Sequence, residues 1–420
     1  MRFFIGLVLT LALGAMGCSD AEGAGGSAGD GGNGGDGGSA GVGGDGGTNG
    51  LEFPCTEQGI RDAIAEGGGP HTFDCDGPQT VVTDAEIVIN NHVILDGGEN
   101  LTVDGNDDHR VFFVNEGVTT ELIGFTVAHG RTQALDINDV RGFCGGGIRN
   151  EGTLKLADSI VTGCFALDGA VEGAGGGICA AGDTTVINSD VSQNAATDGG
   201  GILCGTGYVI GCGRLTLIDS TVTGNTGGGV SGGEPLTLTS TTVSGNVGSG
   251  VGGFAAATIT NTTVSANAGV GISSDYPFGT GGPVAFVNST VTGNADGALW
   301  LFGVWEPEPS FVGTILDGGC RRAWASDGYN IESPGDTCGF DRPTDQVNVS
   351  AENLKLGEIG DNGGPTMTHA LGAGSVAIDQ IPAVECVDAD GEPLTTDQRG
   401  VERPQGDACD VGAVEMEVTP

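Results

Sequence analysis

The sequence predicts an all-β protein that folds as a parallel β-helix, in which short strands repeat coil after coil. Segments of the form DSTVTGN recur at intervals of 30, 31, 21, 21 and 27 residues, with their valines at Val161, Val191, Val222, Val243, Val264 and Val291. A second apolar segment follows each repeat, and an alternating segment such as TLKLADS or RLTLIDS precedes it. Three short strands per repeat, separated by turns rich in Gly and Asn, favour stacked coils over helices or a meander.

The N-terminus is typical of an export signal. Arg2 precedes an apolar run from Phe3 to Gly17, which is shorter than the roughly 20 residues of a membrane span. We therefore assign residues 1–17 to a signal peptide. It ends in AMGC, which resembles the bacterial lipobox and predicts that Cys18 is lipidated, although Ala15 replaces the usual Leu. An ordinary secretory signal is the alternative, whereas lipidation would hold the protein at a membrane.

Residues 18–50 are rich in glycine and contain almost nothing to bury, so we expect a disordered tether. From Ala21 to Gly50, such a chain reaches roughly 30 Å. It would lift a folded body off the membrane.

The charge balance argues against a nucleic-acid partner. The 420 residues include 14 Lys and Arg against 55 Asp and Glu, giving a net charge of −41. Only Arg214 is basic between Leu156 and Cys320. Binding to phosphates requires clustered basic side chains, which this chain does not provide along its middle.

Stacking the repeats assigns the direction of their side chains. If Val222 points inward, Ser220 also points inward, while Thr221 and Thr223 point outward. The repeated asparagine falls at a turn, where stacked amides can bond to one another up the helix. The predicted asparagine ladder comprises Asn194, Asn225, Asn246, Asn267 and Asn294, and Cys164 and Gly130 occupy its column in earlier coils.

Eleven cysteines remain if Cys18 is lipidated, which fits an oxidising compartment. Proximity in the sequence suggests four pairs: Cys55 with Cys75, Cys204 with Cys212, Cys320 with Cys338, and Cys386 with Cys409. One of Cys144, Cys164 and Cys179 must then be unpaired, and the sequence leaves open which. A zinc site is a weaker alternative because no pair has CxxC spacing.

The repeats GGGI, NEGTLKL and DSTVTGN resemble right-handed parallel β-helix proteins of the pectin-lyase-like superfamily. The segment PCTEQGIRDAIAEGGGPHTFDC, with Ile60, Ala63 and Ile64 on one face of a short helix, is similar to their N-terminal cap. This resemblance implies a cap over residues 51–76 and about nine to eleven coils over residues 77–320.

The remaining region, residues 321–420, is expected to be irregular and to carry disulfides. Its segments YNIESPGDTCGF, LGEIGDNGGPTMTHALGAGSVAID and TTDQRGVERPQGDACDVGAVE resemble the choice-of-anchor Q domain of exported bacterial proteins. The resemblance implies a fold and a compartment but no activity. With the signal peptide, it predicts an exported bacterial lipoprotein at the outer membrane or cell surface.

Catalysis is one functional hypothesis, because polysaccharide lyases and glycoside hydrolases occur on this fold. A lyase needs a base beside a uronate carboxylate and a cation or Arg to neutralise that carboxylate. The weak candidates are Asp104, Asp108, His109 and Arg110, with His129 and Arg131 on the next coil and Asp136 and Asp139 beyond. An exposed polar turn explains the same residues, and we commit to none of them as catalytic. His369 is interpreted as structural, and fold alone does not establish activity.

A ligand-binding face is a second hypothesis. Outward hydroxyls would form a regular surface at Thr221, Thr223, Thr242, Ser244, Thr263, Ser265, Thr290 and Thr292. Such a face could bind glycans, other chains or ice, although Thr is also an ordinary strand residue. Trp300 and Trp305 could stack on a sugar or fill space before the C-terminal region.

The acidity suggests a third hypothesis, a calcium-dependent binding module, because loops such as DINDV and NADG supply oxygen ligands. No EF-hand or nonapeptide spacing is present, so solvated charge is the simpler interpretation and no cofactor is expected. We conclude that the sequence favours a membrane-anchored structural or adhesive surface protein. It could bind polysaccharide or a cell-surface protein, and catalysis is the alternative.

Overall fold

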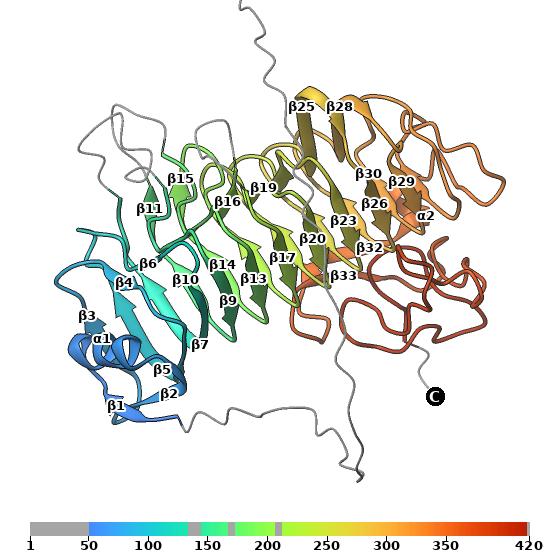
Figure 1. Cartoon of the computed structure of the whole chain (residues 1–420). Coiled ribbons are helices and arrows are strands. Elements are labelled where there is room, and N and C mark those ends of the chain that lie inside the picture. Colours follow the sequence, from blue (N-terminus) through green and yellow to red (C-terminus); the bar gives the residue numbers. More distant parts are fainter. Residues whose placement is uncertain (1–49, 133–143, 167–172, 206–211, 418–420) are drawn as a thin grey trace, which may run out of the picture. The chain divides into compact units, whose positions relative to one another are not determined.

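The computed structural model describes residues 50–132, 144–166, 173–205 and 212–417, but not the side chains of residues 275–280. Signal peptide, Cys18 and tether lie outside these residues, as do Asp136 and Asp139. The described chain is a parallel β-helix whose coils each contribute strands to three rows (Figure 1). Among the described residues, no helix is long and apolar enough to cross a membrane.

The first row and the second row belong to one twenty-stranded sheet. The first row contains β1 (Glu52–Pro54), β2 (Gly68–Asp74), β5 (Val93–Asp104), β7 (Thr119–Ala128), β9 (Thr153–Ala157), β13 (Thr184–Ile187), β17 (Leu215–Ile218), β20 (Leu236–Thr239), β23 (Ala257–Thr260), β26 (Val284–Val287) and β29 (Ser310–Val312). The second row contains β3 (Gln79–Val82), the second halves of β5 and β7, β10 (Ile160–Thr162), β14 (Asp190–Ser192), β18 (Thr221–Thr223), β21 (Thr242–Ser244), β24 (Thr263–Ser265), β27 (Thr290–Thr292), β30 (Ile315–Asp317) and β31 (Ile331–Ser333).

The third row is a separate nine-stranded sheet among the described residues, whereas the first and second rows have eleven members each, so the described coils agree with the predicted nine to eleven. Its strands are β4 (Ile87–Ile89), β6 (Phe112–Val114), β8 (Ile148–Asn150), β12 (Ile178–Ala180), β16 (Ile202–Cys204), β19 (Val230–Gly232), β22 (Val251–Gly252), β25 (Ile272–Gly281) and β28 (Leu299–Trp305). All its pairings are parallel and in register, apart from a shift within the β25–β28 pair.

The core is the column of inward apolar side chains that stacking creates. Val222 and Val243 pair across β18 and β21, and both are fully buried. A single coil could not shield these valines, because each coil buries its apolar residues against its neighbours. One continuous core extends from Ile60 in the cap to Phe340.

The predicted asparagine ladder is present at the turn between the second and third rows. The Asn225 side chain donates from Nδ2 to Asn246 Oδ1 at 3.0 Å, and its backbone N–H donates to the same oxygen at 2.9 Å. Asn194, Asn267 and Asn294 continue the pattern. Cys164 occupies the next position, where its backbone N–H donates to Asn194 Oδ1 at 3.0 Å.

A second ladder lies at the bend between the first and second rows. In the coils from Asp158 to Gly313, a residue with positive φ makes the bend, and the Ser or Thr after it points inward. Ser189 Oγ, for example, donates to Ile187 O at 2.7 Å and accepts from Ser159 N at 3.0 Å. Ser220 holds the equivalent place in its coil. These hydroxyls satisfy backbone groups that the bend removes from strand pairing.

Helix α1 (Glu57–Glu66) covers the N-terminal end of the stack. Its N-cap, Thr56, accepts from Gly59 N at 3.1 Å, and its buried face contains the predicted Ile60, Ala63 and Ile64. An apolar helix face is suited to this place because the end of a solenoid otherwise exposes core and strand edges.

At the other end, parallel pairing continues past the expected boundary at residue 320, because Ile331 of β31 pairs with Ile315 of β30. The rest of the C-terminal region contains α2 (Ala351–Leu354) and the antiparallel pair β32 (Leu356–Gly360) and β33 (Thr368–Leu371). Two-residue strands β11 (Phe165–Ala166) and β15 (Ala195–Ala196) pair within the stack.

Candidate functional site

The predicted hydroxyl face is largely covered by the C-terminal region, so it cannot serve as an open ligand face. Thr242 Oγ1 donates to Met367 O at 2.5 Å, and Thr263 Oγ1 donates to Gln398 Oε1 at 2.6 Å. Six of the eight positions are buried, namely Thr242, Ser244, Thr263, Ser265, Thr290 and Thr292. The reason is chemical: a column of hydroxyls supplies the hydrogen bonds that a polar covering segment needs. Only Thr221 and Thr223 remain half-buried.

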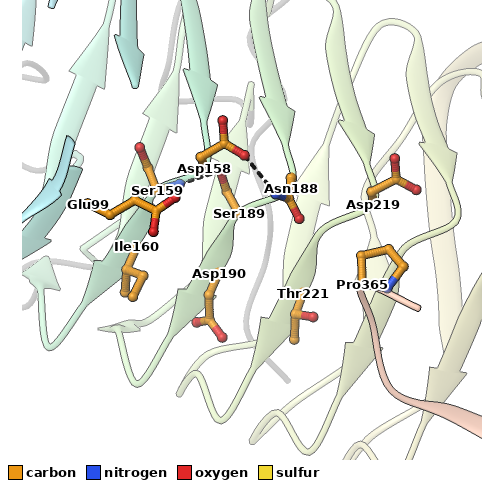
Figure 2. A pocket seen from close by; sticks show the side chains of 10 residues that line it. All are labelled: Glu99, Asp158, Ser159, Ile160, Asn188, Ser189, Asp190, Asp219, Thr221 and Pro365. Carbon is orange, nitrogen blue, oxygen red and sulfur yellow. Dashed lines mark hydrogen bonds between the residues drawn. The ribbon is translucent and has the colours of Figure 1, made fainter. Parts of the chain in front are cut away.

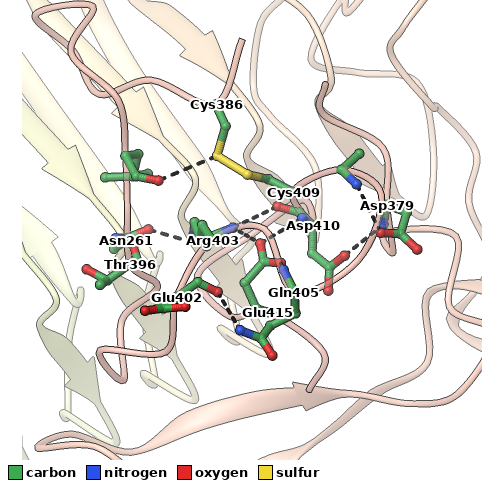
Figure 3. The surroundings of a disulfide bond; sticks show 12 residues. Asn261, Asp379, Cys386, Thr396, Glu402, Arg403, Gln405, Cys409, Asp410 and Glu415 are labelled. Atoms are coloured by element: carbon green, nitrogen blue, oxygen red, sulfur yellow. Dashed lines mark hydrogen bonds and ion pairs between the residues drawn. A yellow bond between two sulfur atoms is a disulfide. The ribbon is translucent and has the colours of Figure 1, made fainter. Parts of the chain in front are cut away.

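A buried ion pair lies within the covering segment where that segment contacts the stack (Figure 3). Arg403 Nη1 donates to Glu415 Oε1 at 2.6 Å, and both side chains are inaccessible to solvent. Arg403 Nη2 also donates to Asn261 Oδ1 at 3.3 Å, while Asn261 Nδ2 donates to Thr396 O at 2.8 Å. Asn261 makes one of the bends between the first and second rows, so a bend residue of the solenoid also anchors the C-terminal region.

The predicted disulfide pattern is present, and the structure resolves the pairing that the sequence left open. The four pairs expected from proximity all form. A fifth disulfide joins Cys144 to Cys179, which leaves Cys164 as the free cysteine of the described chain. Burial raises the pKa of the Cys164 thiol to about 12. A neutral, buried thiol is chemically inert, so this cysteine is structural.

Two of the catalytic candidates come together as a histidine–carboxylate pair. His129 Nδ1 lies 2.8 Å from Asp104 Oδ2, and the His129 side chain is about half exposed. Asp104 ends β5, and His129 follows β7 on the next coil, so stacking brings them together. An Asp that orients one ring nitrogen leaves the other available as a general base.

The other candidates do not complete a site. His109 Nε2 contacts Thr83 Oγ1 at 2.8 Å, whereas Asp108 and Arg131 are both exposed. Arg110 forms an ion pair with Glu86 and donates to the carbonyl oxygens of Gly145 and Cys144. Burial lowers the pKa of the Arg110 guanidinium. These contacts join Arg110 to residues of neighbouring coils, so its role is structural.

A polar groove follows the bends where the second row is uncovered (Figure 2). Asp158, Asn188 and Asp219 stand on successive coils, and Asn188 Nδ2 donates to Asp158 Oδ1 at 2.7 Å. Asp190 also lines the groove, and Pro365 of the C-terminal region closes one end. Burial raises the pKa of both Asp190 and Asp219. No described group of three or more His, Cys, Asp or Glu side chains is arranged to hold a metal ion.

A larger groove, with a cavity volume of about 730 Å³, lies on the outer face of the third row. Its floor is an in-register column of small residues on β19, β22 and β25, namely Ser231, Gly252 and Ser273. The same column continues to bulkier residues: Leu203 on β16 is fully buried and does not line the groove, whereas Trp300 on β28 lines it. The groove is hollow beside Trp300 because the three residues that precede it in the column are small.

Trp300 and the exposed Phe302 are aromatic residues that line this groove, whereas Trp305 does not line it. Trp305 is buried against Phe254, with ring centroids 6.0 Å apart, so it fills the interior. Trp300 is partly exposed and lines the groove, while Cζ of Arg321 lies 3.2 Å from its ring centroid. The sequence pointed to Trp300, but the register of four strands was needed to find the floor beside it.

The comparisons with known proteins agree on the class of fold. Residues 147–304 match the family model described as a right handed beta helix region. The crystal structure of pectate lyase Pel9A aligns with a TM-score of 0.56 and 14% identity, covering 87% of this chain and 96% of that chain. The protein therefore has the fold of a right-handed parallel β-helix.

A second solved structure is more distant. The A-module of the mannuronan C-5 epimerase AlgE6 from Azotobacter vinelandii aligns with a TM-score of 0.32 and 12% identity, covering 68% of this chain and 81% of that chain. A comparison with curated proteins finds no match. The likeness to pectate lyase establishes a shared architecture, and at this identity it establishes no shared activity.

Proposed function

We propose that this protein is a surface-exposed adhesive β-helix that binds polysaccharide through the third-row groove and does not cleave it. The observation that carries this proposal is the groove with Ser231, Gly252 and Ser273 along its floor and Trp300 at one end. Hydroxyls and an aromatic ring in one concave surface are the groups that ligand sites combine for orientation and contact area. The alternative hydroxyl face is occupied by the protein's own C-terminal region.

The lining of the groove supports binding rather than uronate chemistry. A lyase requires a base and a positive group that neutralises the substrate carboxylate. The described lining residues include Asp198 and Asp296 but no Lys, Arg or His. Carboxylates can accept hydrogen bonds from sugar hydroxyls, so this lining suits recognition of an intact chain.

Export and anchoring belong to the same proposal. The signal peptide over residues 1–17, lipidation at Cys18 and the tether over residues 18–50 would place the protein at the outer membrane or cell surface. The disulfides among the described residues support an oxidising compartment. The resemblance of residues 321–420 to the choice-of-anchor Q domain is also consistent with export. We expect Cys18→Ser to move the protein from the membrane fraction to the soluble fraction.

The functional test is to incubate the purified protein with a polysaccharide panel and measure both binding and new reducing or unsaturated ends. Binding without products is the expected result. Product formation would overturn the non-catalytic proposal, and a protein that neither binds nor cleaves any polysaccharide would remove its basis.

The Asp104–His129 pair favours a second candidate, a polysaccharide lyase or glycoside hydrolase. His129 would act as the general base and Asp104 would hold its ring, as their 2.8 Å contact permits. In that case, His129→Ala would abolish product formation, while His92→Ala, at an exposed histidine elsewhere on the stack, would leave it unchanged. Calcium dependence stays a prediction, which binding measurements with and without EDTA would test.

A further inference from the structure

We propose that the third-row groove selects a neutral polysaccharide, whose sugar rings stack on Trp300 while their hydroxyls reach the flanking carboxylates. This inference rests on the proposed polysaccharide binding and specifies its ligand. It depends on three features of the groove: the depth of the floor, the support of Trp300, and the sign of the charge.

The depth of the floor follows from strand register. Ser231, Gly252, Ser273 and Trp300 occupy one outward column on four adjacent strands. Three strand spacings give a floor about 14 Å long, enough for a short run of linked sugars. One coil earlier the column carries Leu203, which is fully buried. A ligand that lies along this column therefore contacts the hydroxyls of Ser231 and Ser273 and the backbone of Gly252, and its other end contacts the ring of Trp300.

Trp300 is supported from outside the groove. Arg321 stacks against one face of its ring, with Cζ 3.2 Å from the ring centroid, and does not line the groove. Arg321 N donates to Leu299 O at 3.2 Å, and the adjacent Cys320 is linked to Cys338. Stacking of a guanidinium on an aromatic face fixes the orientation of the ring. A ring held in this way loses little conformational entropy when a sugar binds.

The charge of the groove excludes one class of polysaccharide. Asp198 lies beside the floor on one side and Asp296 near Trp300, and both carboxylates are exposed. The whole chain carries a net charge of −41. Uronate polymers would be repelled by this field, whereas neutral sugar hydroxyls can donate to the carboxylates. The electronegative face of an indole also attracts the C–H groups of a neutral sugar ring.

The experiment measures the affinity of the full exported chain for a glycan array that contains neutral and uronate polymers. We expect neutral polymers to bind and polygalacturonate and alginate to bind at least tenfold more weakly. Trp300→Ala should weaken binding at least tenfold. Ser231→Leu, which copies the Leu203 of the preceding coil, should have the same effect by filling the floor while leaving Trp300 in place.

Phe113→Ala is the matched control. Phe113 is a partly exposed aromatic residue in the same column of the third row, on β6, and an arginine also lies near its ring. It lies outside the groove, so its loss should change affinity less than twofold.

The outcomes separate this inference from the function on which it rests. Equal or stronger binding of uronate polymers would overturn the neutral specificity while polysaccharide binding stood. Binding that survives both Trp300→Ala and Ser231→Leu would overturn the groove as the site. Failure to bind any polymer on the array would overturn the proposed function itself.

Discussion

Gln398 and Thr242 are 156 residues apart in the sequence, yet Gln398 Nε2 donates to Thr242 Oγ1 at 2.8 Å in a site closed to solvent. The same amide group accepts from Thr263 and donates to Thr366. One side chain of the C-terminal region thus joins two strands of the second row, β21 and β24. This relationship explains why the repeated hydroxyls are not available to an external ligand.

We predict that Gln398→Ala will destabilise the protein by about 1–3 kcal/mol, since it leaves buried hydroxyls without partners. The unfolding free energy from denaturant titration measures the loss. The variant should also expose the covered threonines, so limited proteolysis should cut the C-terminal region faster. Gln405→Ala, at a residue near the same segment with a partly exposed side chain, is the control. Equal stability of the two variants would contradict the assigned role of Gln398.

Replacing an asparagine in the middle of the ladder by alanine should destabilise the protein. Asn246 accepts from both Asn225 N and Asn225 Nδ2, and its own Nδ2 donates to Val222 O and Asn267 Oδ1. Asn246→Ala leaves several of these groups buried and unpaired, so we expect a loss of at least about 2 kcal/mol. Asn100→Ala, at an exposed asparagine, should cost less than about 0.5 kcal/mol. Comparable losses would mean that the ladder is not stabilising.

Cys164 occupies a position of the asparagine ladder, and we predict that an asparagine can replace it. Its Sγ accepts from Gly130 N at 3.4 Å and lies 3.9 Å from Val127 O. We expect Cys164→Asn to be tolerated within about 1 kcal/mol, because an amide can make the same contacts. Peptide mapping after alkylation should find Cys164 unlabelled in the native protein and labelled after denaturation. Labelling of the native protein would contradict the burial that raises the pKa of this thiol to about 12.

Asp410 predicts a pH effect on stability. Burial raises the pKa of this carboxyl from an ordinary value of 3.8 to about 6, although Asp379 N and Met416 N donate to it. The folded protein therefore takes up a proton before the unfolded chain does. Above pH 6, the ionised Asp410 carboxylate lowers the free energy of unfolding. As the pH falls from 7 towards 4 the carboxylate is protonated, and the free energy of unfolding rises by at most about 3 kcal/mol from this group.

The measurement for Asp410 is the slope of the unfolding free energy between pH 7.5 and 4.5. Asp410→Asn keeps one oxygen that can accept a hydrogen bond and cannot titrate. We expect it to lower the free energy of unfolding and to remove the contribution of Asp410 to the pH slope. Burial lowers the pKa of His369, which opposes the Asp410 effect in both proteins and cancels in the comparison. Identical slopes for the two proteins would contradict the raised pKa of Asp410.

Much of the fold follows from local regularity that the sequence displays directly. Val222, Ser220 and Asn225 have their inward places because a strand alternates its side chains and a short coil repeats them at one register. The cap helix, the four short-range disulfides and the asparagine ladder could also be predicted from the sequence. Each depends on residues that are near one another in the sequence or that recur at a constant interval.

The sites were harder to predict because they depend on long-range contacts. Asp104 and His129 were expected to be near one another, since adjacent coils bring them together. The pairing of Cys144 with Cys179 needed the path of the third row. The burial of Thr242 and Thr263 depended on a segment more than 100 residues away, and no repeat in the sequence indicates where an irregular segment folds back.

The sequence by itself thus determined that this chain forms stacked parallel coils with inward valines and laddered asparagines, because that information is periodic. Only the tertiary structure decided which surface remains open. It closed the threonine face with Gln398 and Arg403, and it left a groove over Ser231, Gly252 and Ser273 beside Trp300. Surface shape depends on which side chains meet across coils and on where the C-terminal region lies.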